Sequence, residues 1–284
     1  MKALADWPLE ERRRIIGVFT DIDDTLTTDG AITPDALDAL ARLKAAGRHV
    51  VPITGRPVGW SEAFAATWPV DAIVAENGAV ALVRVDSNSE NGLQGSSNQP
   101  GLLSKMYQQG GRERSANYRR MQAVAARVLR EVPGTTLSQD SPGRDTDIAI
   151  DHSEFSHLPP ERIAQVVGIM RSEGMSATVS SIHINGWYGA HNKLEGARWI
   201  VRNLWGRALD AELDRWVYVG DSTNDQLMFE AFPQSVGVAN IGRFLPELKN
   251  KPRYVSLGER GAGFAEVAGL LCEAPGQDHA GIAP

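Results

Sequence analysis

Two short acidic clusters, each directly after an apolar run, constrain this chain more than any other feature of its sequence. The first is Asp-Ile-Asp-Asp-Thr at residues 21–25, after the apolar run 15–19. The second is Gly-Asp-Ser-Thr-Asn-Asp at residues 220–225, after the apolar run 216–219. In an open parallel α/β sheet the carboxyl ends of the strands line the ligand crevice, so we expect both clusters there. Carboxylates held together repel one another unless a cation lies between them, so the sequence predicts a metal and, with it, a phosphate or similar oxyanion.

Composition narrows the class of protein. The chain has 284 residues, enough for two domains, and its formal net charge of -6 gives none of the basic footprint of a nucleic-acid binder. Its single cysteine, Cys272, excludes an intrachain disulfide and fits a reducing cytoplasm. The N-terminal residues do not form a signal peptide, and no apolar run approaches the roughly 20 residues that span a bilayer. We therefore expect a cytoplasmic protein without nucleic-acid or membrane partners. The sequence sets no oligomeric state.

The order of the predicted elements indicates one split domain with an insertion. Strands at 15–20, 50–53 and 72–75 alternate with helices at 34–46 and 58–67, which is typical of a right-handed parallel sheet. The alternation returns at residue 192, with helices at 192–204, 224–231 and 262–272 and strands at 215–219, 235–238 and 254–257. We expect an α/β fold: a Rossmann-like core (1–82 and 187–272) and an inserted α+β cap (83–186). Within the cap we expect a flexible loop at 86–109, helices at 117–131 and 160–173, and strands at 147–150 and 177–184. The tail 273–284 is expected to be disordered.

The first acidic cluster offers a nucleophile and an acid. Asp21 and Asp23 are two positions apart on an extended turn, so they share one side while Ile22 points into the core. One Asp can attack phosphorus to give an acyl-phosphate, and a second can protonate the leaving oxygen and later deprotonate water. The alternative is that both are turn or capping residues, which are common after strands.

The second cluster favours a catalytic role for Asp21 and Asp23 over a role as turn or capping residues. Asp221 can ligate Mg²⁺, which prefers hard oxygen ligands. Asn224 and Asp225 are expected at the start of the next helix, facing the same crevice. A capping role for Ser222 or Asn224, with Asp225 complementing the helix dipole, is compatible with this.

Two further positions suit a phosphoryl group. Thr54 and Gly55 end the second strand and offer a hydroxyl and backbone donors, although a plain Thr-Gly-Pro turn would look the same. Lys193 is expected at a helix N-terminus, where its charge suits a phosphoryl group, with a solvated surface lysine as the alternative.

In chain order the four pieces are the first acidic cluster, Thr54 after a strand, Lys193 and the second acidic cluster, and in these contexts they resemble the haloacid dehalogenase (HAD) superfamily of phosphohydrolases. The resemblance covers residues 15–78 and 191–271. Asn77-Gly78 and the large insertion are similar to the subgroup with a large α+β cap, which includes sucrose-phosphate, trehalose-phosphate and mannosyl-phosphoglycerate phosphatases and phosphomannomutases. One departure is Asp24, which stands where many members have Gly.

The resemblance implies a role for each matching residue. Asp21 is implied as the nucleophile, Asp23 as the general acid/base, and Thr54, Gly55 and Lys193 as phosphate ligands. The implied Mg²⁺ ligands are the carboxylates of Asp21 and Asp221 and the backbone carbonyl of Asp23, supported by Asn224 and Asp225.

The cap supplies the candidate substrate contacts. Ser181, His183 and Asn185 alternate along the strand that leads back to the core, so they share one face that could meet sugar hydroxyls or simply face solvent. Trp187 and Tyr188 follow, and packing between the domains is the favoured use for them. The predicted substrate residues are, in all, Arg56, Asn77, Arg144, His183 and Asn185.

The predicted function is that of a Mg²⁺-dependent phosphatase acting on a small phosphorylated metabolite, a sugar phosphate by preference. The presence of an acid at Asp23 favours an oxygen leaving group over a halide. A phosphomutase on the same fold and a phospholigand-binding protein without turnover are the alternatives. A kinase of the P-loop type is disfavoured because no GxxxxGK[ST] motif is present.

Overall fold

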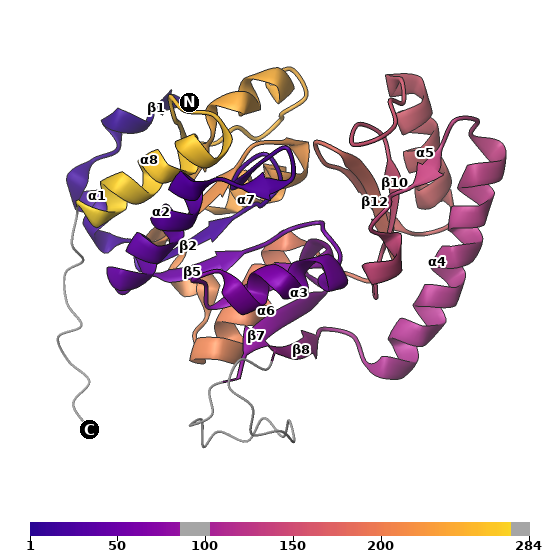
Figure 1. The fold of residues 1–284 in the computed structure, drawn as a ribbon, viewed down its shortest axis with the longest axis horizontal. Helices are drawn as coiled ribbons and strands as arrows, with labels where there is room; N and C mark the ends of the chain where they lie inside the picture. Colours follow the sequence, from indigo (N-terminus) through magenta and orange to yellow (C-terminus); the bar gives the residue numbers. More distant parts are fainter. Residues whose placement is uncertain (86–102, 274–284) are drawn as a thin grey trace. The chain divides into compact units, whose positions relative to one another are not determined.

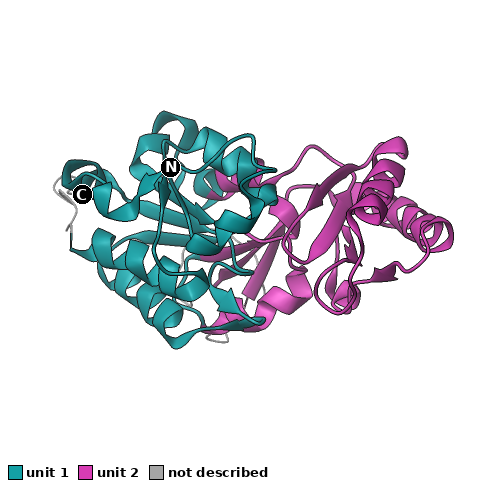
Figure 2. Ribbon diagram, turned by 90° about the horizontal axis from the view of Figure 1, so that it is seen from above, with its two compact units in different colours: residues 1–52, 68–71, 201–284 teal, residues 53–67, 72–200 magenta. Residues whose placement is uncertain are grey.

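A computed structural model describes residues 1–85 and 103–273 of the chain. The chain divides into two compact units, shown in separate colours in Figure 2. The first contains residues 1–52, 68–71 and 201–284, and the second contains residues 53–67 and 72–200.

The first unit is built on a six-stranded sheet in the order β1-β15-β14-β13-β2-β5, with every neighbouring pair parallel. This confirms the predicted α/β class with a parallel sheet, but the expected membership of strand 72–75 in that sheet is wrong, because these residues pair in an antiparallel sheet of the second unit. The strands are β1 (Lys2–Ala3), β2 (Gly17–Thr20), β5 (His49–Pro52), β13 (Trp216–Gly220), β14 (Gln234–Gly237) and β15 (Tyr254–Val255). Further elements of this unit are α1 (Leu9–Arg14), α2 (Pro34–Ala45), α7 (Gln226–Ala231), α8 (Arg260–Cys272) and the short hairpin of β3 (Thr27–Thr28) and β4 (Ala31–Ile32).

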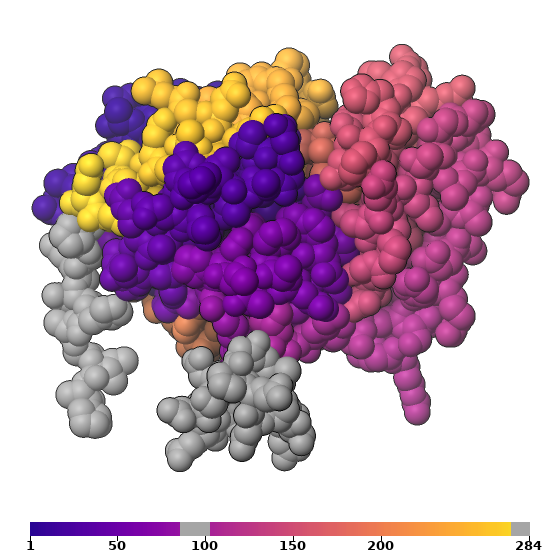
Figure 3. Space-filling view, viewed as in Figure 1, coloured from indigo at the N-terminus to yellow at the C-terminus, as the bar shows by residue number. Residues whose placement is uncertain are grey.

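Helices α2 and α8 lie side by side, as Figures 1 and 3 show in indigo and yellow. Helix α2 begins at Pro34 with Thr33 as an extended N-cap, as predicted, although the Thr33 side chain makes no capping hydrogen bond. A Cβ built on Gly261 would lie 2.0 Å from Thr33 Oγ1, so glycine there permits the start of α8 to approach the start of α2.

The second unit contains a three-stranded antiparallel sheet in the order β6-β7-β8. Its strands are β6 (Ala72–Ala75), β7 (Val80–Arg84) and β8 (Leu103–Tyr107), and two helices of the unit are α3 (Val58–Thr67) and α6 (Lys193–Trp205), the latter running on past residue 200. The expected flexible loop 86–109 was therefore wrong for residues 103–107, because they pair with β7 along its whole length. The remaining expected loop residues up to 102, and the tail 274–284, lie outside the described residues.

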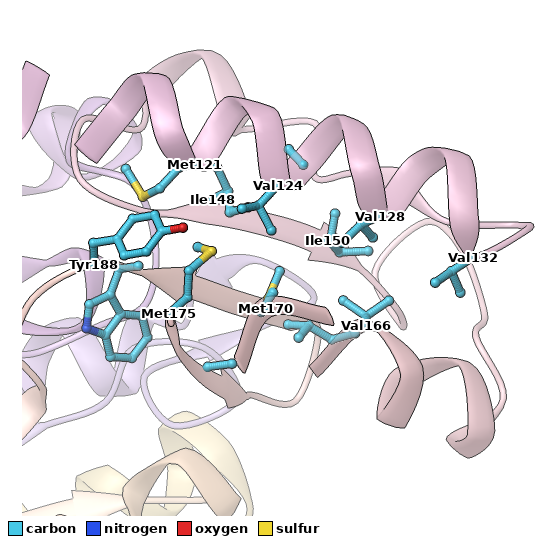
Figure 4. Close-up of a cluster of buried hydrophobic side chains, with 14 residues drawn as sticks. Met121, Val124, Val128, Val132, Ile148, Ile150, Val166, Met170, Met175 and Tyr188 are labelled. Atoms are coloured by element: carbon cyan, nitrogen blue, oxygen red, sulfur yellow. The ribbon is translucent and has the colours of Figure 1, made fainter. Parts of the chain in front are cut away.

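The cap part of this unit is a four-stranded antiparallel sheet, β11-β12-β10-β9, with two helices packed against it. The strands are β9 (Thr136–Leu137), β10 (Ile148–Asp151), β11 (Ser176–Val179) and β12 (His183–Trp187), and the helices are α4 (Gly111–Glu131) and α5 (Pro160–Ser172). Figure 4 shows their shared core, which includes Met121, Val128, Ile150 and Met170. Trp187 and Tyr188 are buried in the same cluster, so they serve packing.

The predicted single strand 177–184 is wrong. The chain forms a hairpin instead, because the Ser180 side chain accepts hydrogen bonds from the backbone of Ile182 and His183 and turns the chain between β11 and β12. Ser181 is therefore at the turn, and only His183 and Asn185 share a strand.

Among the helices that the structure describes, we find none with both the length and the apolar character needed to cross a membrane.

Candidate active site

The first acidic cluster begins directly at the end of β2. The backbone N–H of Asp21 donates to the carbonyl of Val219 at 2.9 Å, which extends the pairing of β2 with β13 by one residue. Asp21 is 4% exposed, Ile22 is buried in the core as predicted, and Asp23 is half-buried. A buried strand thus places one carboxylate below the surface and leaves the next one partly open.

The second cluster is organised by Asp225. Its Oδ2 accepts hydrogen bonds from the backbone N–H groups of Asp221 (3.0 Å) and Ser222 (3.1 Å), and its Oδ1 accepts one from the Tyr218 hydroxyl. Ser222 and Asp225 form a capping box, so the predicted capping role of Ser222 is confirmed, and Asp225 takes part in the cap as well. A Cβ on Gly220 would lie 2.5 Å from Asp225 Oδ2, which explains glycine at the end of β13.

The two clusters meet in one buried group of carboxylates. Asp21, Asp221 and Asp225 each offer an oxygen within 4.8 Å of the others. Burial, together with Asp225 and Asp21, raises the pKa of Asp221 well above its usual value, while the Arg243 guanidinium acts in the opposite direction. Buried hard oxygen ligands at this spacing fit a divalent cation, which would remove their repulsion. Among the described residues, this group includes Asp225, to which the sequence assigned only a supporting role. It does not include the carboxylate of Asp23.

Asp221 is oriented by neighbours that sequence reasoning missed. Its Oδ1 accepts from Thr25 Oγ1 at 3.4 Å, and its Oδ2 accepts from Asn240 Nδ2 at 3.2 Å. Asn240 lies in the short helix η7 (Ala239–Phe244), directly after β14. Its position after a predicted strand was the available signal, since polar residues at strand ends are candidates for the ligand crevice. Asn224, predicted as a support, is half-buried, and its Oδ1 accepts a hydrogen bond from Ser222 Oγ at 2.9 Å.

The predicted phosphate ligands Thr54, Gly55 and Lys193 belong to the second unit. Thr54 is fully buried, its N–H donates to the carbonyl of Val74, and its Oγ1 accepts from the Arg56 N–H, each at 2.9 Å. The Thr54 carbonyl accepts from the N–H of Asn77, whose backbone lies in the left-handed region at φ 55°. The turn 54–57 is therefore held in shape by backbone and hydroxyl bonds.

Lys193 is the first residue of α6 and is only 3% exposed. The alternative of a solvated surface lysine is excluded by this burial. Asn192 precedes it and caps the helix, because its Oδ1 accepts from the N–H of Glu195 at 2.9 Å. A buried lysine at a helix N-terminus is suited to an anion.

The predicted substrate residues converge in one polar network within the second unit. Arg144 Nη1 donates to Asp147 Oδ1 at 2.7 Å and to the Gly55 carbonyl at 3.0 Å. Asn185 Nδ2 donates to Asp147 Oδ2 at 3.0 Å and to the same Gly55 carbonyl at 3.3 Å, and Asn77 Nδ2 approaches Asp147 Oδ2 at 3.5 Å. Asp147 is thus the shared acceptor, and burial raises its pKa to about 7 against the favourable charge of Arg144.

A second part of the network ties Arg56 to cap carboxylates. Arg56 Nη2 donates to Glu154 Oε1 at 2.8 Å, and its Nη1 lies 3.2 Å from Asp140 Oδ2. His183 Nε2 lies 2.7 Å from Glu154 Oε2. Sequence reasoning missed Glu154 and Asp140, since nothing local marks an acid that meets an arginine 98 or 84 positions away.

Glu76 joins the turn 54–57 to the cap. This fully buried carboxylate accepts from the N–H of Val58 at 3.0 Å, from the N–H groups of Asp145 and Thr146, and from the Thr146 hydroxyl. Its backbone is held at φ 49°, a conformation that few non-glycine residues adopt. Glu76 therefore fixes the start of α3 to the segment that carries Arg144 and Asp147.

Comparison with known proteins gives a family match for part of the chain. Residues 18–108 match the family model of haloacid dehalogenase-like hydrolases. The comparison with curated proteins returned no match.

Solved structures share the fold at low identity. A putative HAD/COF-like hydrolase from Plasmodium vivax is 16% identical with a TM-score of 0.64, covering 94% of this chain and 99% of that one. The sucrose-phosphatase of a Synechocystis species, solved with sucrose and phosphate, is 15% identical with a TM-score of 0.61 and coverages of 91% and 98%. The C-terminal domain of Candida albicans trehalose-6-phosphate phosphatase is 15% identical with a TM-score of 0.62 and coverages of 93% and 95%.

The class of protein follows from the matched segment and the shared fold: a hydrolytic enzyme with a parallel α/β core and additional antiparallel sheets. Residues 18–108 match the haloacid dehalogenase-like hydrolases, and the predicted resemblance to that family is confirmed.

Proposed function

We propose that this protein is a Mg²⁺-dependent phosphatase that hydrolyses a sugar phosphate through an aspartyl-phosphate on Asp21. The observation that carries the proposal is the buried group of Asp21, Asp221 and Asp225 at the ends of β2 and β13, in a chain whose residues 18–108 match HAD-like hydrolases. A Mg²⁺ ion held by Asp21, Asp221 and the backbone carbonyl of Asp23 would neutralise charge on the phosphoryl oxygens.

The proposed chemistry is carried by two aspartates. The Asp21 carboxylate attacks phosphorus, a P–O bond to Asp21 forms, and the bond to the leaving oxygen breaks while Asp23 gives that oxygen a proton. Asp23 then takes a proton from water, whose oxygen attacks phosphorus and displaces the Asp21 carboxylate, releasing inorganic phosphate. The half-buried position of Asp23 supports this role, because water must reach it.

The phosphoryl oxygens are assigned to Thr54, Gly55 and Lys193. Connectivity supports the first two: Pro52 pairs with Thr20 across the parallel ladder, Asp21 follows Thr20, and Thr54 follows Pro52 by two residues. The burial of Lys193 at the start of α6 supports the third. Asn224 and Asp225 are assigned supporting roles at the metal.

The proposed substrate follows from the polar network of the second unit. Carboxylate, amide and imidazole groups of Asp147, Asn185, Asn77, Glu154 and His183 offer both acceptors and donors, as sugar hydroxyls require. The fold is shared with a sucrose-phosphatase and a trehalose-6-phosphate phosphatase. We also propose that the chain consists of a catalytic core (1–82 and 187–272) and a cap (83–186).

The test is phosphate release from a panel of phosphorylated sugars and glycerates, with and without Mg²⁺. We expect Mg²⁺-dependent release that is greatest on a sugar phosphate and lost in Asp21→Asn. The matched control is Asp35→Asn, an exposed aspartate of α2, which should retain wild-type release. Isomer formation without free phosphate would point to a mutase instead, and tight binding of an ester without turnover would point to a ligand-binding protein.

A further inference from the structure

Asp24 occupies a backbone position that favours glycine. Its φ is 56°, in the left-handed region, which glycine adopts most readily. Asp is tolerated there better than most side chains, but the conformation still costs free energy unless the surroundings stabilise it. The contacts of Asp24 therefore indicate what this residue contributes.

Three side chains from the C-terminal part of the first unit hold Asp24. Arg243 Nη2 donates to Asp24 Oδ2 at 2.8 Å, and Arg260 Nε lies 3.0 Å from Asp24 Oδ1. Asn240 Nδ2 donates to the Asp24 carbonyl at 3.0 Å, and Asn240 Oδ1 accepts from the Arg260 N–H at 2.9 Å. The extra negative charge of Asp24 is thus matched by two arginines.

Arg243 reaches further, to the buried acidic group. The same Nη2 atom lies 3.4 Å from Asp221 Oδ2, although the Arg243 side chain is 44% exposed and Asp221 is fully buried. One guanidinium is therefore shared between Asp24 and Asp221. Among the described contacts of Arg260, which pairs with Asp24 and lies 3.9 Å from Asp29, none reaches Asp221.

We propose that Arg243, held in place by Asp24, is a built-in counter-cation of the acidic group that lowers its affinity for the divalent metal. The physical reason is Coulombic: three carboxylates within 4.8 Å need positive charge, and a guanidinium beside one of them supplies part of it. A divalent metal ion that binds beside this guanidinium then gains less electrostatic free energy. Asp24, which pairs with Arg243 at 2.8 Å, serves to anchor this arginine. The inference rests on the proposed metal site.

The test is calorimetric titration of Mg²⁺ into the full chain. In Arg243→Gln we expect Mg²⁺ to bind roughly tenfold more tightly, the size of effect expected for one partly screened charge close to a dication. Arg243→Lys, which keeps the charge, should bind close to wild type. The matched control is Arg260→Gln, which loses the other arginine on Asp24 and should change the affinity less than Arg243→Gln does.

A second readout uses thermal unfolding without any turnover. In EDTA, Arg243→Gln should melt below Arg260→Gln, because its acidic group has lost its counter-cation. Mg²⁺ should then raise the melting temperature of Arg243→Gln more than that of wild type. Asp24→Asn, which removes the anchor of Arg243, should also bind Mg²⁺ more tightly than wild type, and Arg243→Gln added to it should change the affinity less than Arg243→Gln does alone.

Failure of the inference is distinguishable from failure of the proposed function. Equal or weaker Mg²⁺ binding in Arg243→Gln, with normal binding in wild type, would overturn the counter-cation role and leave the metal site standing. Absence of Mg²⁺ binding in folded wild-type protein would overturn both.

Discussion

Asp147→Asn should remove a specific pH dependence from the stability of this protein. Asp147 is fully buried, and burial raises its pKa to about 7 from an ordinary value of 3.8, despite the opposing charge of Arg144. A carboxyl whose pKa is raised by folding holds its proton longer in the folded state than in the unfolded state. Its contribution to stability is therefore fully present below about pH 4 and is lost as the pH rises to about 7.

The magnitude follows from the two pKa values. Each pH unit between them corresponds to 1.36 kcal/mol, so the gap of about three units gives about 4 kcal/mol. Solvent does not reduce this free energy by screening, because the Asp147 carboxyl is fully buried. Asparagine has nearly the same shape as aspartate but does not titrate. Its amide N–H groups would face the donor of Asn185, so the variant should also lose about 1–3 kcal/mol of unfolding free energy at every pH.

The assay is urea unfolding of wild type and variant at intervals from pH 4 to pH 8. The difference in unfolding free energy, wild type minus variant, should decrease by about 4 kcal/mol over this range, while contributions shared by both proteins cancel. The control is Asp145→Asn, two positions away and 41% exposed, which should follow the wild-type pH dependence. A difference between wild type and Asp147→Asn that stays constant from pH 4 to pH 8 would refute the reasoning.

Three further changes test other parts of the structure. Gly220→Ala places a Cβ 2.5 Å from Asp225 Oδ2, so urea unfolding should show a loss of about 1–3 kcal/mol, whereas Gly269→Ala, with nothing within 4 Å, should show none. Met170→Ala should cost about 2–5 kcal/mol by the same measurement, because Met170 is fully buried in the cap core. Glu76→Gln places an amide against several N–H donors, so we expect a raised KM for the proposed sugar-phosphate substrate with a smaller change in kcat. An unchanged KM would contradict the role of Glu76 in joining the turn 54–57 to the cap.

Local patterns were sufficient to predict the central strands of the parallel sheet, but not that strand 72–75 pairs in a separate antiparallel sheet. Apolar runs at 15–20, 50–53 and 215–219 correspond to β2, β5 and β13, since a strand buried on both faces reads as a continuous apolar segment. Helix α2 was predictable from Thr33, Pro34 and the spacing of its leucines, because helix starts carry a local signal. Strand β8 was missed because Leu103–Tyr107 is marked only by its pairing with β7, a long-range contact.

The candidate site shows the same difference between what local sequence predicts and what long-range contacts decide. The sequence by itself placed Asp21 and Asp221 at strand ends, because the order of strands and acids is local information. Only the tertiary structure decided that Asp225 joins them, that Lys193 is buried, and that Arg243 is shared between Asp24 and Asp221. The physical reason is that burial and charge pairing depend on which distant segments pack together, and the pair of Arg243 with Asp24 spans 219 positions.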